Sequence, residues 1–372
     1  MKQSHKRILK EIGLKAAACG LKAWAVGGCA RDLLIGKHTE DIDICVEGDT
    51  SPLIMFCAEK YGAEVVRFND FGTARVNLDC GLKLDFVRCR TEIYAEPGAL
   101  PKVRPAGLKE DLFRRDFTAN ALALSLMPGE FFKEYDFFNS KEAVLNGYIK
   151  VLHDKSFSDD PTRLFRAVRF AARFNWKIEP FTDGLMQEAV KKGYINILSR
   201  QRIVHEFIKI LGESRPYKAL KYAAEYKLAD FIFKGFKFNA KINKLKTVEE
   251  KLACLSLLQG GRGPEFEQSL LLPKKITALS LEVLKWRKSK AAPFKALSKE
   301  ALRVIKLYKP GIESFKLKPI LLRAEDLNGL GYSGPALGAG LKALAKAQYA
   351  GKVKNREEAF TYIKRRAFKA RL

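Results

Sequence analysis

The chain has 372 residues, with 68 lysines and arginines against 42 aspartates and glutamates, which gives a formal net charge of +26. At roughly 100–200 residues per domain, this length predicts more than one packed unit. No run of about 18 apolar residues occurs, which excludes a membrane-spanning helix. The opening residues do not resemble a secretory signal, so we expect a cytoplasmic protein. The seven cysteines form no Cys-x-x-Cys pair, which argues against a disulfide framework and a structural zinc site.

The positive charge indicates a polyanionic partner, although charge alone is also compatible with a solvated basic surface. Basic residues are spread over the whole chain and become denser near its end. They include Lys364, Arg365, Arg366, Lys369 and Arg371. This spread favours a long binding face over a single disordered arm.

The predicted elements change in character along the chain. Short strands bounded by Gly, Asn or Asp are expected at residues 23–26, 41–46, 74–78 and 82–87. A long helix follows at 161–174, and beyond about residue 198 the apolar residues recur at helical spacing. Two glycine-rich stretches, 260–264 and 329–340, predict loops. The pattern predicts an α+β chain, with a mixed α/β head followed by an all-helical part.

The strand at 23–26 runs into Gly27 and Gly28, and a helix is expected just after them. Glycines at such a junction allow a phosphate to reach backbone N–H groups at a helix N-terminus. Arg31 would add a guanidinium that can grip the same phosphate. On its own, a glycine pair at this position is more often only a tight turn.

The strand at 41–46 places Asp41 and Asp43 on one face and its isoleucines on the other, because side chains alternate along a strand. Two carboxylates about 6–7 Å apart on one face repel each other unless a cation lies beside them. Mg²⁺, with oxygen ligands and substrate phosphates, meets that need. Asp85, on the strand at 82–87, is a weaker candidate for a third carboxylate. The alternative is a solvated strand end.

The glycine turn, the arginine and the carboxylate pair together suggest nucleotidyl transfer, in which metal ions activate a hydroxyl and stabilise the departing pyrophosphate. The sequence has no Gly-x-x-x-x-Gly-Lys motif, which disfavours a P-loop ATPase. Further along, Arg115 is a candidate ligand for triphosphate or sugar, with Asp116 and Asn120 expected to hold the local backbone. An ordinary salt-bridged helix surface is the competing interpretation of this segment.

The segment that begins at Asp160 predicts a nucleobase reader. Pro161 suits the first turn of a helix, which makes Asp160 a candidate N-cap, and capping is its alternative role. At about 100° per residue, one helix face carries an arginine stripe. Its members are Arg163, Arg166, Arg169 and Arg173. An aspartate accepts from the exocyclic amino group of cytosine or adenine, and an arginine donates to the neighbouring ring nitrogen. Asp160 with Arg163 would therefore accept C and A and reject U and G.

Several further motifs complete the pattern, among them Arg202-x-x-x-Glu206, which we interpret as an i,i+4 ion pair of the scaffold. The motifs, in chain order, are Gly27-Gly28-x-x-Arg31-Asp32, Asp41-x-Asp43, Phe71-Gly72-Thr73-Ala74, Arg90-Thr91-Glu92-x-Tyr94, Pro97-Gly98-Ala99-Leu100-Pro101, Arg114-Arg115-Asp116-Phe117-Thr118, Asp160-Pro161-x-Arg163 and Arg202-x-x-x-Glu206. In this order they resemble the class II tRNA nucleotidyltransferases, that is, the bacterial CCA-adding enzymes and their poly(A) polymerase relatives. The resemblance covers residues 20–212 and is fainter beyond.

The resemblance implies a catalytic head at 1–145, a base-reading neck at 146–212, a helical body at 213–308 and a basic tail at 309–372 that binds tRNA. It implies that Asp41 and Asp43 hold Mg²⁺ and that the acceptor arm of tRNA lies along the helices. It further implies that CTP and ATP are the substrates; no protein partner is implied. The residues implied to contact the nucleotide are Gly27, Gly28, Arg31, Arg115, Asp160, Arg163, Arg166 and Arg169.

The chain departs from the family pattern at residues 136–142, where Asp-Phe-Phe-Asn-Ser-Lys-Glu replaces a hinge-like Asp-Pro-x-x-Gly-x-x-Asp. In the family that segment couples head and neck movements, so the resemblance implies that this departure affects the switch from C to A addition. Full CCA addition is the expectation. The alternatives are an A-only or CC-only enzyme of a split pair, a poly(A) polymerase, and an RNA-binding module without catalysis.

Overall fold

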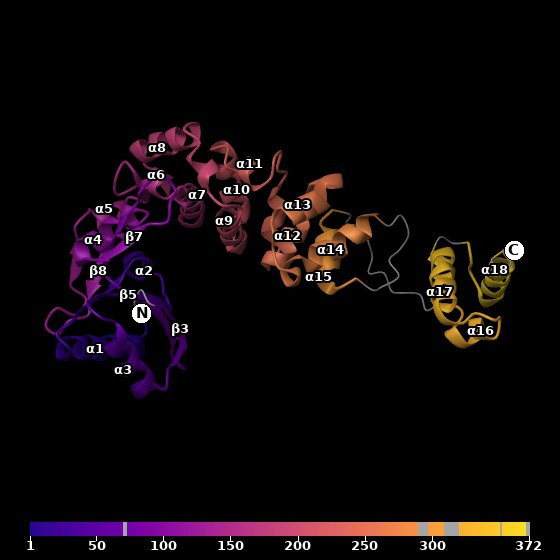
Figure 1. Cartoon of the computed structure of the whole chain (residues 1–372), viewed down its shortest axis with the longest axis horizontal. Helices are drawn as coiled ribbons and strands as arrows, with labels where there is room; N and C mark the ends of the chain where they lie inside the picture. The colour runs from indigo at the N-terminus through magenta and orange to yellow at the C-terminus, as the bar shows by residue number, and fades with distance from the viewer. Residues whose placement is uncertain (70–72, 289–296, 309–319, 350–351, 370–372) are drawn as a thin grey trace. The chain divides into compact units, whose positions relative to one another are not determined.

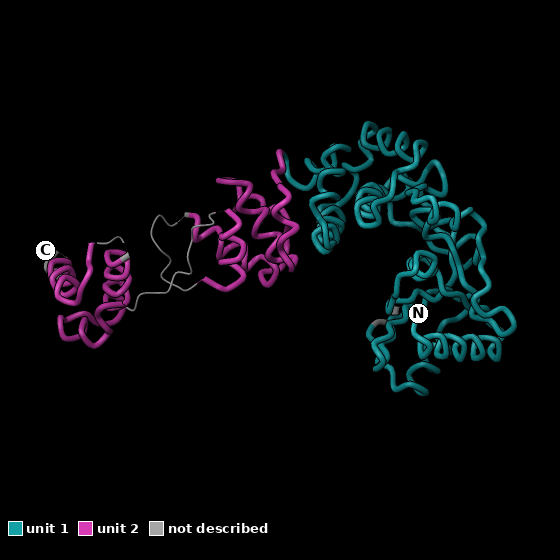
Figure 2. Tube along the Cα trace, turned by 180° about the vertical axis from the view of Figure 1, so that it is seen from behind, with its two compact units in different colours: residues 1–234 teal, residues 235–372 magenta. Residues whose placement is uncertain are grey.

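The computed structural model describes the chain except for residues 70–72, 289–296, 309–319, 350–351 and 370–372 (Figure 1). The predicted motif residues Phe71 and Gly72, and the predicted basic residue Arg371, lie outside the described part. The chain divides into two compact units, residues 1–234 and 235–372, coloured separately in Figure 2. No helix of the described part is both long enough and apolar enough to cross a membrane.

A seven-stranded sheet forms the centre of the first half of unit 1, in the order β3-β4-β5-β2-β1-β8-β9. The strands are β1 (Lys22–Val26), β2 (Asp41–Glu47), β3 (Glu64–Asn69), β4 (Thr73–Asn77), β5 (Lys83–Arg88), β8 (Leu122–Ser125) and β9 (Glu134–Asp136). The β2–β5 pair is parallel, whereas the other neighbours are antiparallel. The central strands β1 and β2 are the ones whose ends carry the glycine turn and the carboxylate pair.

The remaining elements of unit 1 surround and extend this sheet. They are a hairpin of β6 (Arg90–Ile93) and β7 (Lys102–Pro105), a short parallel pair of β10 (Tyr148–Ile149) and β11 (Lys177–Ile178), the 3-10 turns η1 (Thr118–Asn120) and η2 (Tyr194–Ile197), and the helices α1 (Gln3–Ala18), α2 (Gly28–Leu34), α3 (Ser51–Tyr61), α4 (Leu108–Phe113), α5 (Ser140–Leu145), α6 (Ser156–Asp159), α7 (Thr162–Phe174), α8 (Pro180–Lys191), α9 (Arg200–Gly212), α10 (Pro216–Glu225) and α11 (Ala229–Ile232).

The two faces of the sheet are buried by different helices. Ile42 and Ile44 of β2 point into the larger core, which α1 and α3 close. Cys45 points to the opposite face of β2 and lies in a second core with Leu108 and Leu112 of α4. Asp41 and Asp43 alternate with the isoleucines and share a strand face with Cys45, so β2 presents both carboxylates on the α4 side of the sheet.

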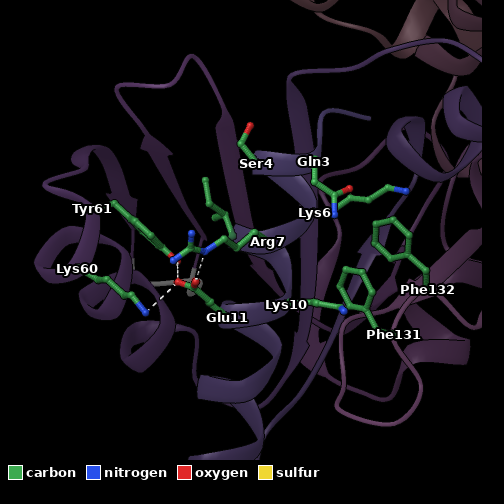
Figure 3. Close-up of a pocket in the computed structure, with 11 residues that line it drawn as sticks. Gln3, Ser4, Lys6, Arg7, Lys10, Glu11, Lys60, Tyr61, Phe131 and Phe132 are labelled. Atoms are coloured by element: carbon green, nitrogen blue, oxygen red, sulfur yellow. Dashed lines mark hydrogen bonds and ion pairs between the residues drawn. The ribbon is translucent and has the colours of Figure 1, made fainter.

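Glu11 ties α1 to the end of α3 on the outer side of these helices, as Figure 3 shows. Its carboxylate accepts hydrogen bonds from Arg7 (3.0 Å) and Tyr61 (2.6 Å) and lies 2.8 Å from the Lys60 ammonium group. These donors, with Lys60 the largest contributor, lower the pKa of Glu11 to about 2. The carboxylate therefore stays charged under all ordinary conditions and holds the two helices together.

Unit 2 is helical throughout the part that the structure describes. Its elements are η3 (Ala240–Lys244), α12 (Val248–Leu258), η4 (Gly260–Arg262), α13 (Gly263–Ser269), α14 (Lys274–Lys288), α15 (Lys299–Lys306), α16 (Ala324–Asn328), α17 (Gly334–Tyr349) and α18 (Arg356–Lys369). A capping box of Thr247 and Glu250 starts α12, whose side chains are almost all buried. Leu327, Leu344 and Ile363 bring α16, α17 and α18 around a small core of their own.

The predicted fold class is confirmed, and the predicted strands and the helix at 161–174 are found within one or two residues of their expected bounds. The two predicted loops are partly wrong. Gly263 begins α13 and Gly334 begins α17, so helix covers much of both stretches. Glycine is required at the start of α13 for packing, because a Cβ at position 263 would approach the Ser256 carbonyl oxygen to 2.6 Å. The finer division into head, neck, body and tail remains a prediction.

We expect opposite effects from replacing two helical glycines by alanine. A Cβ on Gly13 in α1 would lie 1.7 Å from the Leu126 backbone oxygen, so α1 would have to move off the sheet. Gly13→Ala should lower the free energy of unfolding by about 2–3 kcal/mol. Gly184, exposed in α8, has no atom within 4 Å of the corresponding position. Gly184→Ala should raise the free energy of unfolding by about 0.5–1 kcal/mol.

Denaturant unfolding of both variants and the wild type checks this pair. A Gly13→Ala protein as stable as the wild type would contradict the close approach of α1 to the sheet.

Candidate active site

The turn between β1 and α2 is shaped by Gly27. Its φ of +70° lies in the region that favours glycine, and a Cβ there would meet Arg115 Nη1 at 2.7 Å and Asp43 Oδ2 at 3.3 Å. Gly28 opens α2 immediately afterwards. The glycine turn therefore lets Arg115 and Asp43 approach the backbone at the start of α2, and the predicted approach of a phosphate to this turn stays a prediction.

The three candidate carboxylates lie on neighbouring strands but in different environments. Asp41 is exposed at the start of β2, with Lys83 Nζ 3.9 Å away, and Asp43 is half-buried. Burial raises the pKa of Asp43, an effect that Arg115 opposes and that Asp85 and Asp41 reinforce. This carboxylate would therefore gain from a cation beside it.

Asp85 stands opposite Asp43 in the parallel register, and its carboxylate faces an arginine. Arg75 of β4 donates to both Asp85 oxygens, with Nε at 2.7 Å from Oδ1. In the described part, no three His, Cys, Asp or Glu side chains converge as a metal-binding group. The structure thus leaves Asp41 and Asp43 as the carboxylate pair and engages Asp85 with Arg75.

Asp111 orients the two arginines that follow α4. It is fully buried, and its carboxylate accepts from Arg115 Nη2 at 2.9 Å and from Arg114 Nε at 2.9 Å. Burial works against the charge of Asp111, but Arg115 and Arg114 outweigh it and lower the pKa of this carboxyl. Arg114 also donates to Glu92 at 3.1 Å. Asp111 therefore holds Arg115 through Nη2, while the Nη1 of Arg115 lies at the glycine turn.

A second network is centred on Asp116. Its Oδ1 accepts from the Phe117 amide at 2.9 Å and from Asn120 Nδ2 at 2.8 Å, and its Oδ2 accepts from Arg166 Nε at 2.9 Å. Asn120 in turn accepts a hydrogen bond from Arg31. Despite burial, Arg166 and Asn120 bring the pKa of Asp116 to about 2. The sequence predicted that Asp116 and Asn120 hold the local backbone; Asp116 does so at Phe117, whereas the Asn120 side chain bonds to Asp116 and Arg31, and the two residues together fix two arginines.

The start of α7 places the predicted base-reading pair. Asp160 Oδ1 accepts from the Thr162 amide at 3.0 Å, one residue before the Pro161 N-cap of α7, which resembles the capping role that the sequence offered as the alternative to base reading. Arg163 is buried, and it donates to Ser156 Oγ at 2.8 Å and to the Arg114 carbonyl at 2.6 Å. The other arginines of the stripe follow along α7, where Arg169 and Arg173 both face Glu213.

The predicted ion pair between Arg202 and Glu206 is wrong. Arg202 instead donates to Asp160 Oδ1 at 2.7 Å and to the Gly98 carbonyl at 2.8 Å. Glu206 lies beside Lys209 (2.8 Å) and Arg169 (3.8 Å). Helical spacing permits an i,i+4 pair, but the long Arg202 side chain gains more from a carboxylate and a carbonyl that converge on it from other segments.

These groups meet around one cavity of about 500 Å³. Nine predicted residues line it, namely Gly27, Gly28, Arg31, Asp43, Arg115, Asp160, Arg163, Arg166 and Arg169; Asp41 and Asp85 are outside its wall. The lining includes seven arginines and four carboxylates, a balance that favours a polyanion such as a triphosphate. Phe170 also lines the cavity and was not predicted, because its apolar periodicity resembles that of an ordinary core residue.

Comparison with known proteins gives consistent results. Residues 23–150 match the poly A polymerase head domain, and residues 175–239 match the probable RNA and SrmB-binding site of polymerase A. The A-adding tRNA nucleotidyltransferase of Aquifex aeolicus is 35% identical over 331 residues, which are 82% of this chain and 39% of that protein. Relatives named CC-adding and CCA-adding enzymes also match. The chain spans 26% to 50% of the length of three A-adding relatives.

Solved structures match over nearly the whole chain. A CCA-adding enzyme in an apo form superposes with a TM-score of 0.76 at 25% identity, covering 98% of this chain and 96% of that one. A tRNA nucleotidyltransferase in complex with a primer tRNA and an incoming ATP analogue is 30% identical, with a TM-score of 0.64 over 91% of this chain and 99% of that one. The chain therefore belongs to the tRNA nucleotidyltransferase and poly(A) polymerase family.

Proposed function

We propose that this protein is a template-independent nucleotidyltransferase that adds C and A residues to the 3′ end of tRNA, with CTP and ATP as substrates. The observation that carries the proposal is the single arginine-rich cavity, in which the glycine turn, Asp43 and the pair of Asp160 and Arg163 meet. Phosphate-binding groups and a base-reading pair within one cavity are what a nucleotide-selecting enzyme without a template requires.

In this proposal, Arg31 and Arg115 bind the triphosphate at the start of α2, where backbone N–H groups add to the positive field. Asp160 accepts from the exocyclic amino group of the base, and Arg163 donates to the adjacent ring nitrogen. The 3′ hydroxyl of the RNA then loses its proton to solvent as its oxygen bonds to the α-phosphorus, the bond from that phosphorus to the bridging oxygen breaks, and pyrophosphate leaves.

Asp41 and Asp43 fit Mg²⁺, because both supply oxygen ligands from one strand face and burial leaves Asp43 in need of a cation. With Asp85 engaged by Arg75, the remaining ligands would be substrate phosphates and waters, which Mg²⁺ commonly retains. When bound, Mg²⁺ would supply activation of the 3′ hydroxyl and neutralisation of the charge on the phosphates.

A second candidate, addition of the terminal A only, is favoured by the names of the relatives. Three matched relatives that are 35% to 40% identical are A-adding enzymes. The departure at residues 136–142 is in agreement with this candidate, since a one-nucleotide enzyme needs no switch between C and A.

Extension of two tRNAs by the purified protein with Mg²⁺ tests both candidates. One tRNA lacks the whole CCA end and the other lacks only the final A, and each is offered CTP, ATP, UTP and GTP singly and CTP with ATP. Addition of CCA to the first tRNA supports the proposal, and extension of only the second supports A-only addition. Long A tails, or no extension of either, would overturn both.

Neutralising the carboxylate pair should separate catalysis from binding. We expect Asp41→Asn and Asp43→Asn each to lower the transfer rate by about 10³-fold or more, because the cation site is lost. Binding of tRNA, measured by fluorescence anisotropy, should remain within about twofold. Residual transfer above a tenth of the wild-type rate would contradict the metal assignment.

Asp43→Asn should also raise the midpoint of thermal unfolding. A raised pKa means that the folded state disfavours the charged form of Asp43, so stability falls as pH rises above the ordinary pKa of an aspartate. The neutral amide avoids that cost at pH 7, and scanning calorimetry in the absence of metal measures the difference. A lower midpoint for Asp43→Asn would contradict this electrostatic description.

If Asp160 and Arg163 read the base, a substitution at Asp160 should change the selectivity among the four nucleoside triphosphates. An Asp160→Asn amide can also donate a hydrogen bond, so it no longer rejects the carbonyl of uracil or guanine. We expect the preference of kcat/KM for ATP and CTP over GTP and UTP to fall about 10- to 100-fold. Asp159→Asn, the same change one residue earlier and outside the cavity wall, is the matched control and should keep the preference. Unchanged selectivity in Asp160→Asn would remove this residue from base recognition.

A further inference from the structure

The Arg31 guanidinium is fixed along its edges and on one of its faces. Along the edges, Nε donates to Asp32 Oδ1 at 2.9 Å and Nη1 donates to Asn120. Its central carbon lies over the ring of Phe174, 4.5 Å from the centroid, and 5.6 Å from that of Phe170. Arg31 is only 5% exposed and lines the nucleotide cavity. Two rings of α7 therefore lie against a side chain of α2.

The Phe174 ring has a defined orientation although it does not line the cavity. The Trp176 ring stacks on it, with centroids 4.7 Å apart and planes 30° apart, and the Lys37 ammonium group lies 4.9 Å from its centroid. Phe174 is half-buried in the last turn of α7. Of the cavity-lining residues that Phe174 neighbours, Arg31 lies nearest to its ring at 4.5 Å, compared with Arg173 at 5.9 Å and the Phe170 ring at 6.0 Å.

An aromatic ring suits this position for an electrostatic reason. Arg31 shares the cavity with six other arginines, so its charge is repelled before a nucleotide arrives. Asp32 already meets Nε and Nη2 of this guanidinium, at 2.9 and 2.8 Å, and Asn120 accepts from Nη1. The negative face of a ring adds stabilisation of the cation from above without occupying a further N–H group.

From this geometry we propose that Phe174 is a positioning residue, which holds the Arg31 guanidinium toward the triphosphate by a cation–π contact between α7 and α2. This inference rests on the proposed function, because it assumes that the cavity binds a nucleoside triphosphate. It assigns to Phe174 an effect on nucleotide affinity, with no direct contact between Phe174 and the nucleotide.

Graded fluorination of the ring tests the contact without changing its shape appreciably. Mono-, di- and trifluorophenylalanine at position 174 weaken the negative face of the ring stepwise. We expect the Kd of ATP, measured by calorimetry with Mg²⁺ and no RNA, to rise with each fluorine, reaching about 2- to 30-fold. The KM for ATP should rise in parallel, while kcat and the thermal midpoint stay within about twofold and 2 °C of the wild type.

The matched control is the same series at Phe165, which is fully buried on the same helix and outside the cavity wall. There the Kd should not change. Phe174→Leu removes the ring and should weaken ATP binding to the same extent as the trifluoro ring. Phe174→Trp keeps an aromatic face and should bind ATP as tightly as the wild type.

If the Kd of ATP does not depend on fluorination at position 174, the proposal is overturned, and Phe174 then has only a packing role. Failure of the proposed function would be recognised separately. If the wild type binds ATP but extends no tRNA, the fluorination series still decides the role of Phe174, because the Kd requires no acceptor. If the wild type does not bind ATP, both proposals are overturned.

Discussion

The arrangement of the cavity depends on one buried carboxylate, Asp116. Its two oxygens serve different parts of unit 1, since Oδ1 holds Asn120, and through it Arg31 of α2, while Oδ2 holds Arg166 of α7. Burying a carboxylate costs free energy unless its oxygens accept hydrogen bonds. Asp116 accepts four, from the Phe117 amide, from Asn120 Nδ2 and from Nε and Nη2 of Arg166. Removing Asp116 would therefore release arginines on both sides of the cavity at once.

The same requirement explains why so many arginines can lie close together. Each one is held by a group that is not itself a phosphate, such as Asp111 for Arg115, Glu213 for Arg169 and an aromatic face for Arg31. These partners partly neutralise the positive charge that would otherwise attract a triphosphate. In return, the guanidinium groups are already oriented when the nucleotide arrives, so little ordering entropy remains to be lost on binding.

Local patterns in the sequence predicted the site better than long-range ones. Alternation along β2 was enough to place Asp41 and Asp43 together, because it depends only on neighbouring residues. The engagement of Asp85 by Arg75 is also local, since β4 and β5 are consecutive antiparallel strands and the two residues are ten apart, but the expectation paired no side chains across the two strands. The partner of Arg202 was missed because Asp160 lies 42 residues away and the helical spacing offered Glu206 instead. Gly334 was expected in a loop, yet it opens α17.

Selection of a base without a template requires that the base-reading and phosphate-binding groups keep a constant separation, and the backbone near Arg114 provides this. The Arg114 carbonyl accepts from Arg163, the proposed base reader, while the next residue, Arg115, lies against the glycine turn. A single peptide unit thus connects both ends of the nucleotide site. Because a purine is larger than a pyrimidine, ATP and CTP cannot both bridge one rigid separation with the same geometry. Arg202 donates to both Asp160 and the Gly98 carbonyl, so the proposed base-reading residue is tied to two further segments of unit 1 as well as to the start of α7.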